Sequence, residues 1–126
     1  MGWLLGARPA IVQRWRSFSA DDDLTAPLLL RAECTSALTR LVHRAQTNEV
    51  DARLQVLRMP RIPFRIVERA PLYTRAFDIA RSLGWAKAYD ALYLAAAEIE
   101  DAELLTVDRG MSDAAARLGI RATLVR

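Results

Sequence analysis

The C-terminal third of the chain alternates helical and strand patterns, and this alternation limits the fold more than any other feature. A helical pattern over about residues 87–100 precedes the apolar strand "AELLTV", and a second helix at about 110–118 precedes the strand "IRATLV". Strands that alternate with helices across short loops form right-handed crossovers and a parallel sheet covered on both faces. The sequence therefore predicts an α/β fold, a three-layer α/β/α sandwich with a central parallel sheet.

The earlier segments extend the same pattern toward the N-terminus. Further helices are predicted over 9–18, which Pro9 opens, over about 31–46, from Asn48 to Pro60, and from Pro71 to Gly84. Between them, "LTAPLLL" is short and apolar enough for a buried parallel strand, and "PFRIVE" alternates as an edge strand does. Because 126 residues without a repeat or linker suit one domain, we expect a single domain over 1–126.

The compartment follows from what the chain contains near its start. The apolar run "MGWLLGA" is too short to span a bilayer, and no basic residue precedes it as in a signal peptide. We therefore expect a cytoplasmic protein with no membrane segment. Cys34 is the only cysteine, and its helical, apolar surroundings favour a packing role over a reactive thiol.

Charge is distributed unevenly along the chain. Residues 1–81 hold 13 arginines against 8 acidic residues, whereas residues 82–126 hold 5 basic residues against 7 acidic ones. A basic half beside an acidic half would let one face bind a polyanion while the other collects metal ions, although a solvated surface explains the same counts equally well.

Three acidic residues fall where a sheet of this kind binds its ligands, beyond the carboxyl ends of the strands. Asp108 follows the strand "AELLTV" by one residue, Asp90 lies in the first turn of its helix, and Glu33 is expected in the first turn of the helix after "LTAPLLL". Taken singly, Glu33 and Asp90 are explained by the free N–H groups at a helix start, which stabilise a nearby carboxylate. Asp108 would be a good N-cap of the following helix.

Together the three acids favour a metal site. Carboxylates that converge at one strand edge repel one another unless a divalent cation binds between them, and Mg²⁺ or Mn²⁺ is the natural occupant of an all-oxygen site. Such an ion activates water for in-line attack on a phosphodiester. Thr106 and Arg109 would flank it with a hydroxyl group and a positive charge.

Other chemistries find little support in the sequence. His43 is the only histidine and reads as a surface residue, which argues against a histidine-based triad or a zinc site. The glycines are isolated and form no phosphate-binding loop. The stripe of Trp85, Tyr89 and Tyr93 has helical spacing, and it is better explained as core or dimer interface than as a platform for stacking bases.

The segments "LTAPLLLRAECTSALTRLV", "YDALYLAAAE", "LLTVDRG" and "LGIRATLV", in that order, resemble the PIN-domain ribonucleases and, among them, the VapC-type toxins of bacterial toxin–antitoxin pairs. The resemblance covers about residues 3–126. It implies a small α/β/α sandwich, a magnesium- or manganese-dependent endoribonuclease that cuts RNA, a homodimer and a cognate antitoxin. It also matches Glu33, Asp90 and Asp108 to the metal ligands of the family, with Thr106 beside them.

One family residue has no counterpart in this sequence. PIN domains begin with a buried central strand that ends in an aspartate, whereas Met1 stands directly before the matching segment "WLLGARPAIVQRW". The acids at 21–23 do not replace it, because they precede the second strand at the opposite edge. We expect a gap in the middle of the sheet, from either a start codon placed too far downstream or a real truncation. The alternative function is then a catalytically silent PIN-like binding module.

Overall fold

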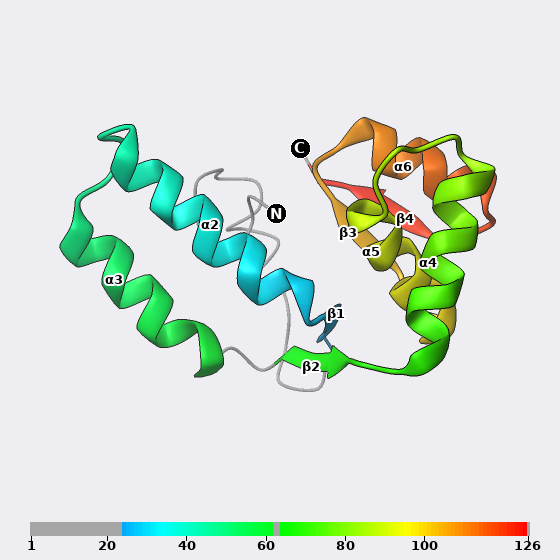
Figure 1. Cartoon of the computed structure of the whole chain (residues 1–126), viewed down its shortest axis with the longest axis horizontal. Coiled ribbons are helices and arrows are strands. Elements are labelled where there is room, and N and C mark those ends of the chain that lie inside the picture. Colours follow the sequence, from blue (N-terminus) through cyan, green and yellow to red (C-terminus); the bar gives the residue numbers. More distant parts are fainter. Residues whose placement is uncertain (1–23, 62–63, 126) are drawn as a thin grey trace. The chain divides into compact units, whose positions relative to one another are not determined.

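The computed structural model describes residues 24–61 and 64–125, and it is a mixed α/β structure, as predicted (Figure 1). The helix expected over 9–18 and the acids at 21–23 lie outside the described residues. The helices and strands, in chain order, are β1 (Leu24–Pro27), α2 (Leu29–His43), α3 (Glu49–Arg58), the 3-10 turn η2 (Met59–Arg61), β2 (Phe64–Val67), α4 (Ala70–Ser82), α5 (Tyr89–Ile99), β3 (Leu104–Thr106), α6 (Arg109–Arg117) and β4 (Ala122–Leu124).

The described residues divide into two compact units. The first, which we call the hairpin unit, holds α2 and α3; the second, the C-terminal unit, holds residues 25–27 and everything from 66 to 125. Each unit has its own buried residues, so each is described separately.

In its described residues, the hairpin unit has the helices α2 and α3 packed side by side (Figure 1). Asn48 caps α3 as predicted, because its side-chain oxygen accepts a hydrogen bond of 2.8 Å from the N–H group of Asp51. On α2 the spacing of buried Leu30, Cys34 and Leu38 is four residues, which places all three on one face of the helix. The predicted packing role of Cys34 is confirmed.

The C-terminal unit is built around a continuous hydrophobic core. Leu72 and Ile79 of α4 and Leu94 of α5 are fully buried, and small alanines on α5 and α6 let these helices approach their neighbours closely. Trp85 and Tyr93 pack against this core, whereas Tyr89 is 59% exposed. The expected core role therefore holds for two of the three aromatic residues in the predicted stripe.

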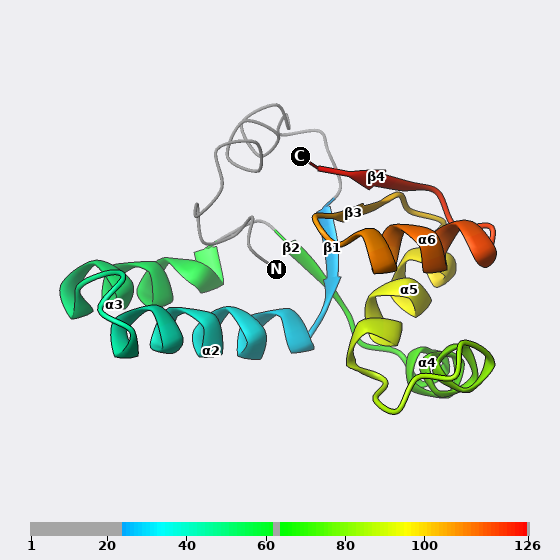
Figure 2. The same ribbon diagram turned by 90° about the horizontal axis from the view of Figure 1, so that it is seen from above.

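Strand pairing in the C-terminal unit follows the predicted crossover. β3 and β4 are parallel, with Leu104, Leu105 and Thr106 opposite Ala122, Thr123 and Leu124, and α6 connects them. In Figure 2 these strands run along one side of α6 and α5, and α4 packs on α5. β1 pairs with β2 in a separate two-stranded sheet, and no strand of residues 24–61 or 64–125 joins the two pairs.

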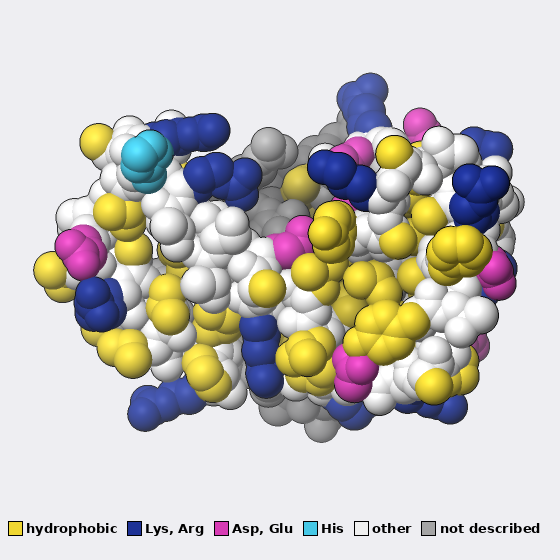
Figure 3. All heavy atoms as spheres, in the orientation of Figure 1, with side chains coloured by type: hydrophobic (Ala, Val, Ile, Leu, Met, Phe, Trp, Pro, Cys, Tyr) yellow, Lys and Arg dark blue, Asp and Glu magenta, His cyan; other side chains and the backbone are white. Residues whose placement is uncertain are grey.

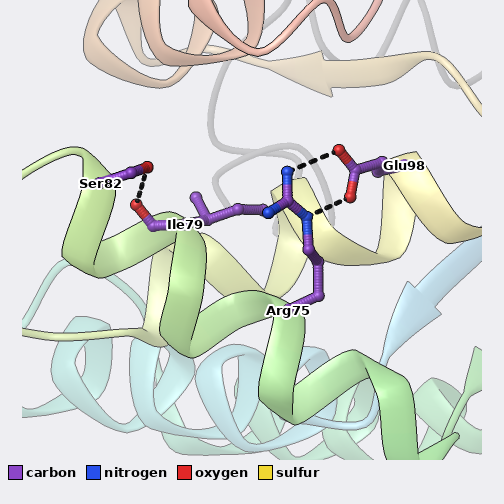
Figure 4. A network of polar contacts seen from close by, with 4 residues as sticks. All are labelled: Arg75, Ile79, Ser82 and Glu98. Carbon is purple, nitrogen blue, oxygen red and sulfur yellow. Dashed lines mark hydrogen bonds and ion pairs between the residues drawn. The ribbon is translucent and has the colours of Figure 1, made fainter.

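An ion pair joins α4 to α5 at the surface of the C-terminal unit (Figure 4). Arg75 donates through Nε and Nη2 to the two carboxylate oxygens of Glu98, at 2.5 and 2.9 Å. This fork-to-fork geometry lowers the pKa of Glu98, because the hydrogen bonds from Arg75 favour the ionised carboxylate. About two turns further along α4 than Arg75, the Ser82 hydroxyl donates to the Ile79 carbonyl oxygen at 2.9 Å.

Candidate functional site

Asp108 lies in the turn that leads from β3 into α6, two residues beyond the last residue of the strand. It caps α6: Oδ1 accepts hydrogen bonds from the N–H groups of Gly110 at 2.7 Å and Met111 at 3.3 Å. The N–H group of Asp108 in turn donates to Oγ1 of Thr106 at 3.1 Å. The predicted N-cap is thus present, and hydrogen bonds to residues before and after Asp108 stabilise the turn that carries the carboxylate.

Thr106 has a structural role that its position in the sequence did not indicate. Its hydroxyl oxygen accepts a backbone hydrogen bond, and this contact closes the turn between the strand and Asp108. The side chain is half-buried. We conclude that its first structural effect is on the backbone of the Asp108 turn.

Asp90 lies in the first turn of α5, as predicted, and its side chain is exposed. Among residues 24–61 and 64–125 its carboxylate has no hydrogen-bond or ion-pair partner, and the same holds for Oδ2 of Asp108. Both aspartates therefore present carboxylate oxygens to solvent at helix N-termini, where the helix dipole favours negative charge.

Topology brings these two aspartates to one edge of the C-terminal unit. Since α5 runs into β3 and packs against it in the reverse direction, the start of α5 lies at the carboxyl end of β3. α6 starts at that same end. Figure 2 shows the first turns of α5 and α6 on the same side of the unit. Asp90 and Asp108 thus share the edge at which parallel sheets of α/β proteins bind their ligands.

Glu33 belongs to the hairpin unit, and its predicted place in the helix was wrong. α2 begins at Leu29, so Glu33 stands in the second turn, and the first turn of α2 holds no acidic residue. The reason is that β1 ends at Pro27, which leaves the following leucines free to start the helix earlier than expected. The side chain of Glu33 is half-buried. Its charge adds to burial in raising the pKa of neighbouring Cys34.

Arg109 is the first residue of α6 and is exposed beside Asp108. Its guanidinium group has no hydrogen-bond or ion-pair partner in the described part of the chain. A planar guanidinium fork of this kind matches the oxygens of a phosphate group. His43, at the end of α2, is exposed as predicted.

The donor atoms at this edge are carboxylate oxygens, the type of ligand that hard divalent cations take. Within residues 24–61 and 64–125, no group of three or more His, Cys, Asp or Glu side chains is placed to hold a metal. Magnesium, however, usually keeps several waters and takes one or two carboxylates together with substrate phosphates. Two exposed carboxylates with unpartnered oxygens, Asp90 and Asp108, satisfy that requirement.

Sequence reasoning missed one residue of the site, Gly110. Its N–H group makes the shortest hydrogen bond to Asp108, and a Cβ atom at this position would stand 3.1 Å from Oδ1. The signal in the sequence was the glycine two residues after the acid in "VDRG".

None of the helices in the described residues is both long and apolar enough to cross a bilayer.

Comparisons with known proteins agree on one relationship. The profile of the PIN domain matches residues 3–117 of this chain. The VapC ribonuclease Mb0985 of Mycobacterium bovis and the ribonuclease VapC9 of Mycobacterium tuberculosis are each 32% identical to the chain over 98 residues. That alignment covers 78% of this chain and 75% of each relative. All the candidate site residues lie inside the region that the profile matches.

Proposed function

Because this chain belongs to the PIN-domain family, we propose that it is a metal-dependent endoribonuclease, the toxin of a type II toxin–antitoxin pair, which hydrolyses RNA phosphodiester bonds. The observation that carries the proposal is the pair Asp90 and Asp108, two solvent-facing carboxylates at the carboxyl end of β3 in a chain related to ribonucleases.

Each residue of the site has a stated role in this proposal. Asp90 and Asp108 hold the ion, which is Mg²⁺ or Mn²⁺. Thr106 fixes the turn that carries Asp108, and Arg109 binds a phosphate oxygen of the RNA. When bound, the ion supplies an activated water and neutralises charge on the leaving oxygen.

The protein's own contribution is positioning. The capping bonds from the start of α6 fix Oδ1 of Asp108, so that Oδ2 faces the edge where substrate arrives. A positively charged side chain at Arg109 draws the RNA backbone to the same place, and arginines between residues 53 and 81 hold the RNA backbone as well.

The proposal extends to assembly and compartment. The whole chain, residues 1–126, would act as one cytoplasmic domain, pair with a second copy, and bind a cognate antitoxin that blocks the acidic edge. Support for a homodimer comes from exposed aromatic side chains on the C-terminal unit, where apolar atoms gather in Figure 3. Tyr73, Phe77 and Tyr89 are 50%, 62% and 59% exposed, which suits an interface better than a solvated surface.

An RNA cleavage assay tests the enzyme proposal. We expect purified protein to cut RNA with Mg²⁺ or Mn²⁺ and not with EDTA, and Asp108→Asn to abolish cutting. Asn is as good an N-cap as Asp, so this substitution removes a charged ligand while keeping the start of α6. Asp113→Asn, which changes an exposed acid on the same helix, is the matched control and should cut as wild type does. Cutting that is independent of metal, or that survives Asp108→Asn, would refute the proposal.

One observation favours the alternative, a catalytically silent PIN-like module that binds a partner without cutting RNA. In the described ranges 24–61 and 64–125, no three ligating side chains gather at one place. Expression in bacteria separates the two functions. Growth arrest that a partner encoded directly upstream relieves would exclude the silent module, whereas co-purification with that partner and unchanged cellular RNA would favour it.

A further inference from the structure

Gly110, the second residue of α6, stands unusually close to the Asp108 carboxylate. Its N–H group donates to Oδ1 at 2.7 Å. A Cβ atom built on its backbone would lie 3.1 Å from the same oxygen, which is tighter than nine in ten real Cβ contacts. Any side chain at this position would therefore press on the carboxylate.

The backbone at Gly110 does not itself require glycine. Among the described glycines, Gly84 and Gly119 have positive φ angles, and Gly110 does not. Within a helix, glycine is less favourable than alanine, because it loses more conformational entropy. The close contact with Asp108 is thus the feature of the structure that explains a glycine here.

The contact has a direct consequence for Asp108. With Oδ1 held by the N–H groups of Gly110 and Met111, rotation of the carboxylate is restricted and Oδ2 keeps one direction. A methyl group at residue 110 would push Oδ1 off its shorter capping bond and turn Oδ2 with it, because the two oxygens share one planar group.

We propose that Gly110 is a positioning residue, which holds the Asp108 carboxylate in the orientation that binds a divalent cation. The inference rests on the proposed function, since it takes Asp108 to be a metal ligand. Groups that orient a metal ligand typically change metal affinity by about 10–100-fold when they are altered.

Calorimetric titration of the full chain with Mn²⁺ alone tests this role. We expect Gly110→Ala to raise the dissociation constant by about 10–100-fold. Its urea midpoint in EDTA should shift less than that of the control, because better helix formation offsets the weakened cap. The matched control is Ala116→Gly, the reverse exchange at an exposed position of α6. It should lower the urea midpoint and leave Mn²⁺ affinity unchanged.

Gly110→Ser provides a second variant, because it adds the same Cβ atom with a polar group beyond it. It should weaken Mn²⁺ binding by a similar factor. Wild-type affinity in both variants would overturn the inference. If neither variant folds, the glycine is required for α6 itself, and the positioning role is overturned as well.

A third titration, of Asp108→Asn, separates this inference from the proposed function. If the wild type binds Mn²⁺, Asp108→Asn does not, and the variants at residue 110 bind normally, the positioning role fails and the proposed function stands. If Asp108→Asn binds as wild type does, or the wild type does not bind, both fail together.

Discussion

The hairpin unit and the C-terminal unit keep their helices in place by different means. In the C-terminal unit, α4, α5 and α6 bury side chains in one shared core, in which Leu94 is fully buried. In the hairpin unit, α3 buries Ala52 and turns larger apolar side chains outward: Val50 is 70% exposed and Leu57 is 65% exposed.

This difference shows which interactions hold each unit. Among the described residues, the polar contacts of α3 are local ones, the Asn48 cap and an exposed ion pair of 3.1 Å between Glu49 and Arg53. Such features contribute about 0.3–2 kcal/mol each, whereas a core of buried leucines contributes more per residue. The hairpin unit also has a solvent-facing groove of about 430 Å³, at which α3 buries the small side chain of Ala52. It is lined by Leu38, Thr39, Val42, His43, Glu49, Ala52, Arg53 and Val56.

The largest expected effect is that of truncating the shared core. Leu94→Ala should lower the free energy of unfolding by about 2–5 kcal/mol, since it leaves a cavity among residues with no solvent exposure. Leu57→Ala in α3 is the matched control, and it should change stability by no more than about 0.5 kcal/mol. Urea unfolding followed by circular dichroism measures both. Equal losses would break the contrast between the units.

The second effect comes from Cys34, whose thiol is buried in the hairpin unit. Burial raises its pKa to about 11, with a further contribution from the charge of Glu33. Since the folded pKa lies above that of an unfolded chain, the stability contributed by the protonated thiol is complete below about pH 9. It is lost as the pH rises toward 11, a change of about 2 kcal/mol.

Urea unfolding between pH 8.5 and pH 11 measures this loss. The Cys34→Ala variant has no thiol to titrate, so its stability should fall less across the same window. If wild type and variant decline in parallel, the thiol is not buried as described, and the small core of the hairpin unit is more open than the comparison assumes.

A third, smaller effect concerns the helix ends. α2 is followed by Ala45 at a φ angle of 55°, whereas the turn after α4 has Gly84 at 71°. Side chains disfavour this left-handed region, so Ala45→Gly should raise the free energy of unfolding by about 1 kcal/mol, and Gly84→Ala should lower it by a similar amount. Thermal unfolding of the two variants measures the shifts. A destabilised Ala45→Gly variant would contradict this account of the turn.

The smallest effect is that of the ion pair between α4 and α5. Glu98→Gln should cost at most about 1 kcal/mol, because both partners are more than a third exposed. Arg75 lowers the pKa of Glu98, so the contribution is present above the ordinary glutamate pKa. It is lost as the pH falls through the lowered value. Stability differences from wild type between pH 7 and pH 3 measure this, with Asp113→Asn as a control that should show no such trend.

Much of the fold could be predicted because its signals are local. The Asn48 cap, the glycines at the ends of α4 and α6, and the helix–strand alternation after residue 87 are each set by neighbouring residues, and the structure and the family match confirm them. The division of "LTAPLLL" between a strand and a helix start was not predictable, because an apolar run has no period that marks a boundary. This is why Glu33 was misplaced.

In the candidate site, too, some features follow from the local sequence and others depend on the folded structure. Asp90 and Asp108 could be placed from the sequence, because a first-turn acid and an N-cap are local features. The hydrogen bond from Asp108 to Thr106 and the closeness of Gly110 depend on the shape of one turn, which residue types alone do not determine. The separation of β1–β2 from β3–β4 depends on pairing between distant segments, and no local pattern records it.

The two carboxylate oxygens of Asp108 have different surroundings, and this affects how the residue at this position should be interpreted in related proteins. Oδ1 of Asp108 caps α6 and Oδ2 faces solvent. A related protein that has lost catalytic activity would therefore still need a helix cap at this position. Asn, Ser and Thr cap helices as well as or nearly as well as Asp, so these are the residues through which activity is lost while the fold survives. Under the proposed function, an aspartate at this position therefore does not by itself mark an active enzyme, whereas an asparagine marks a silenced one.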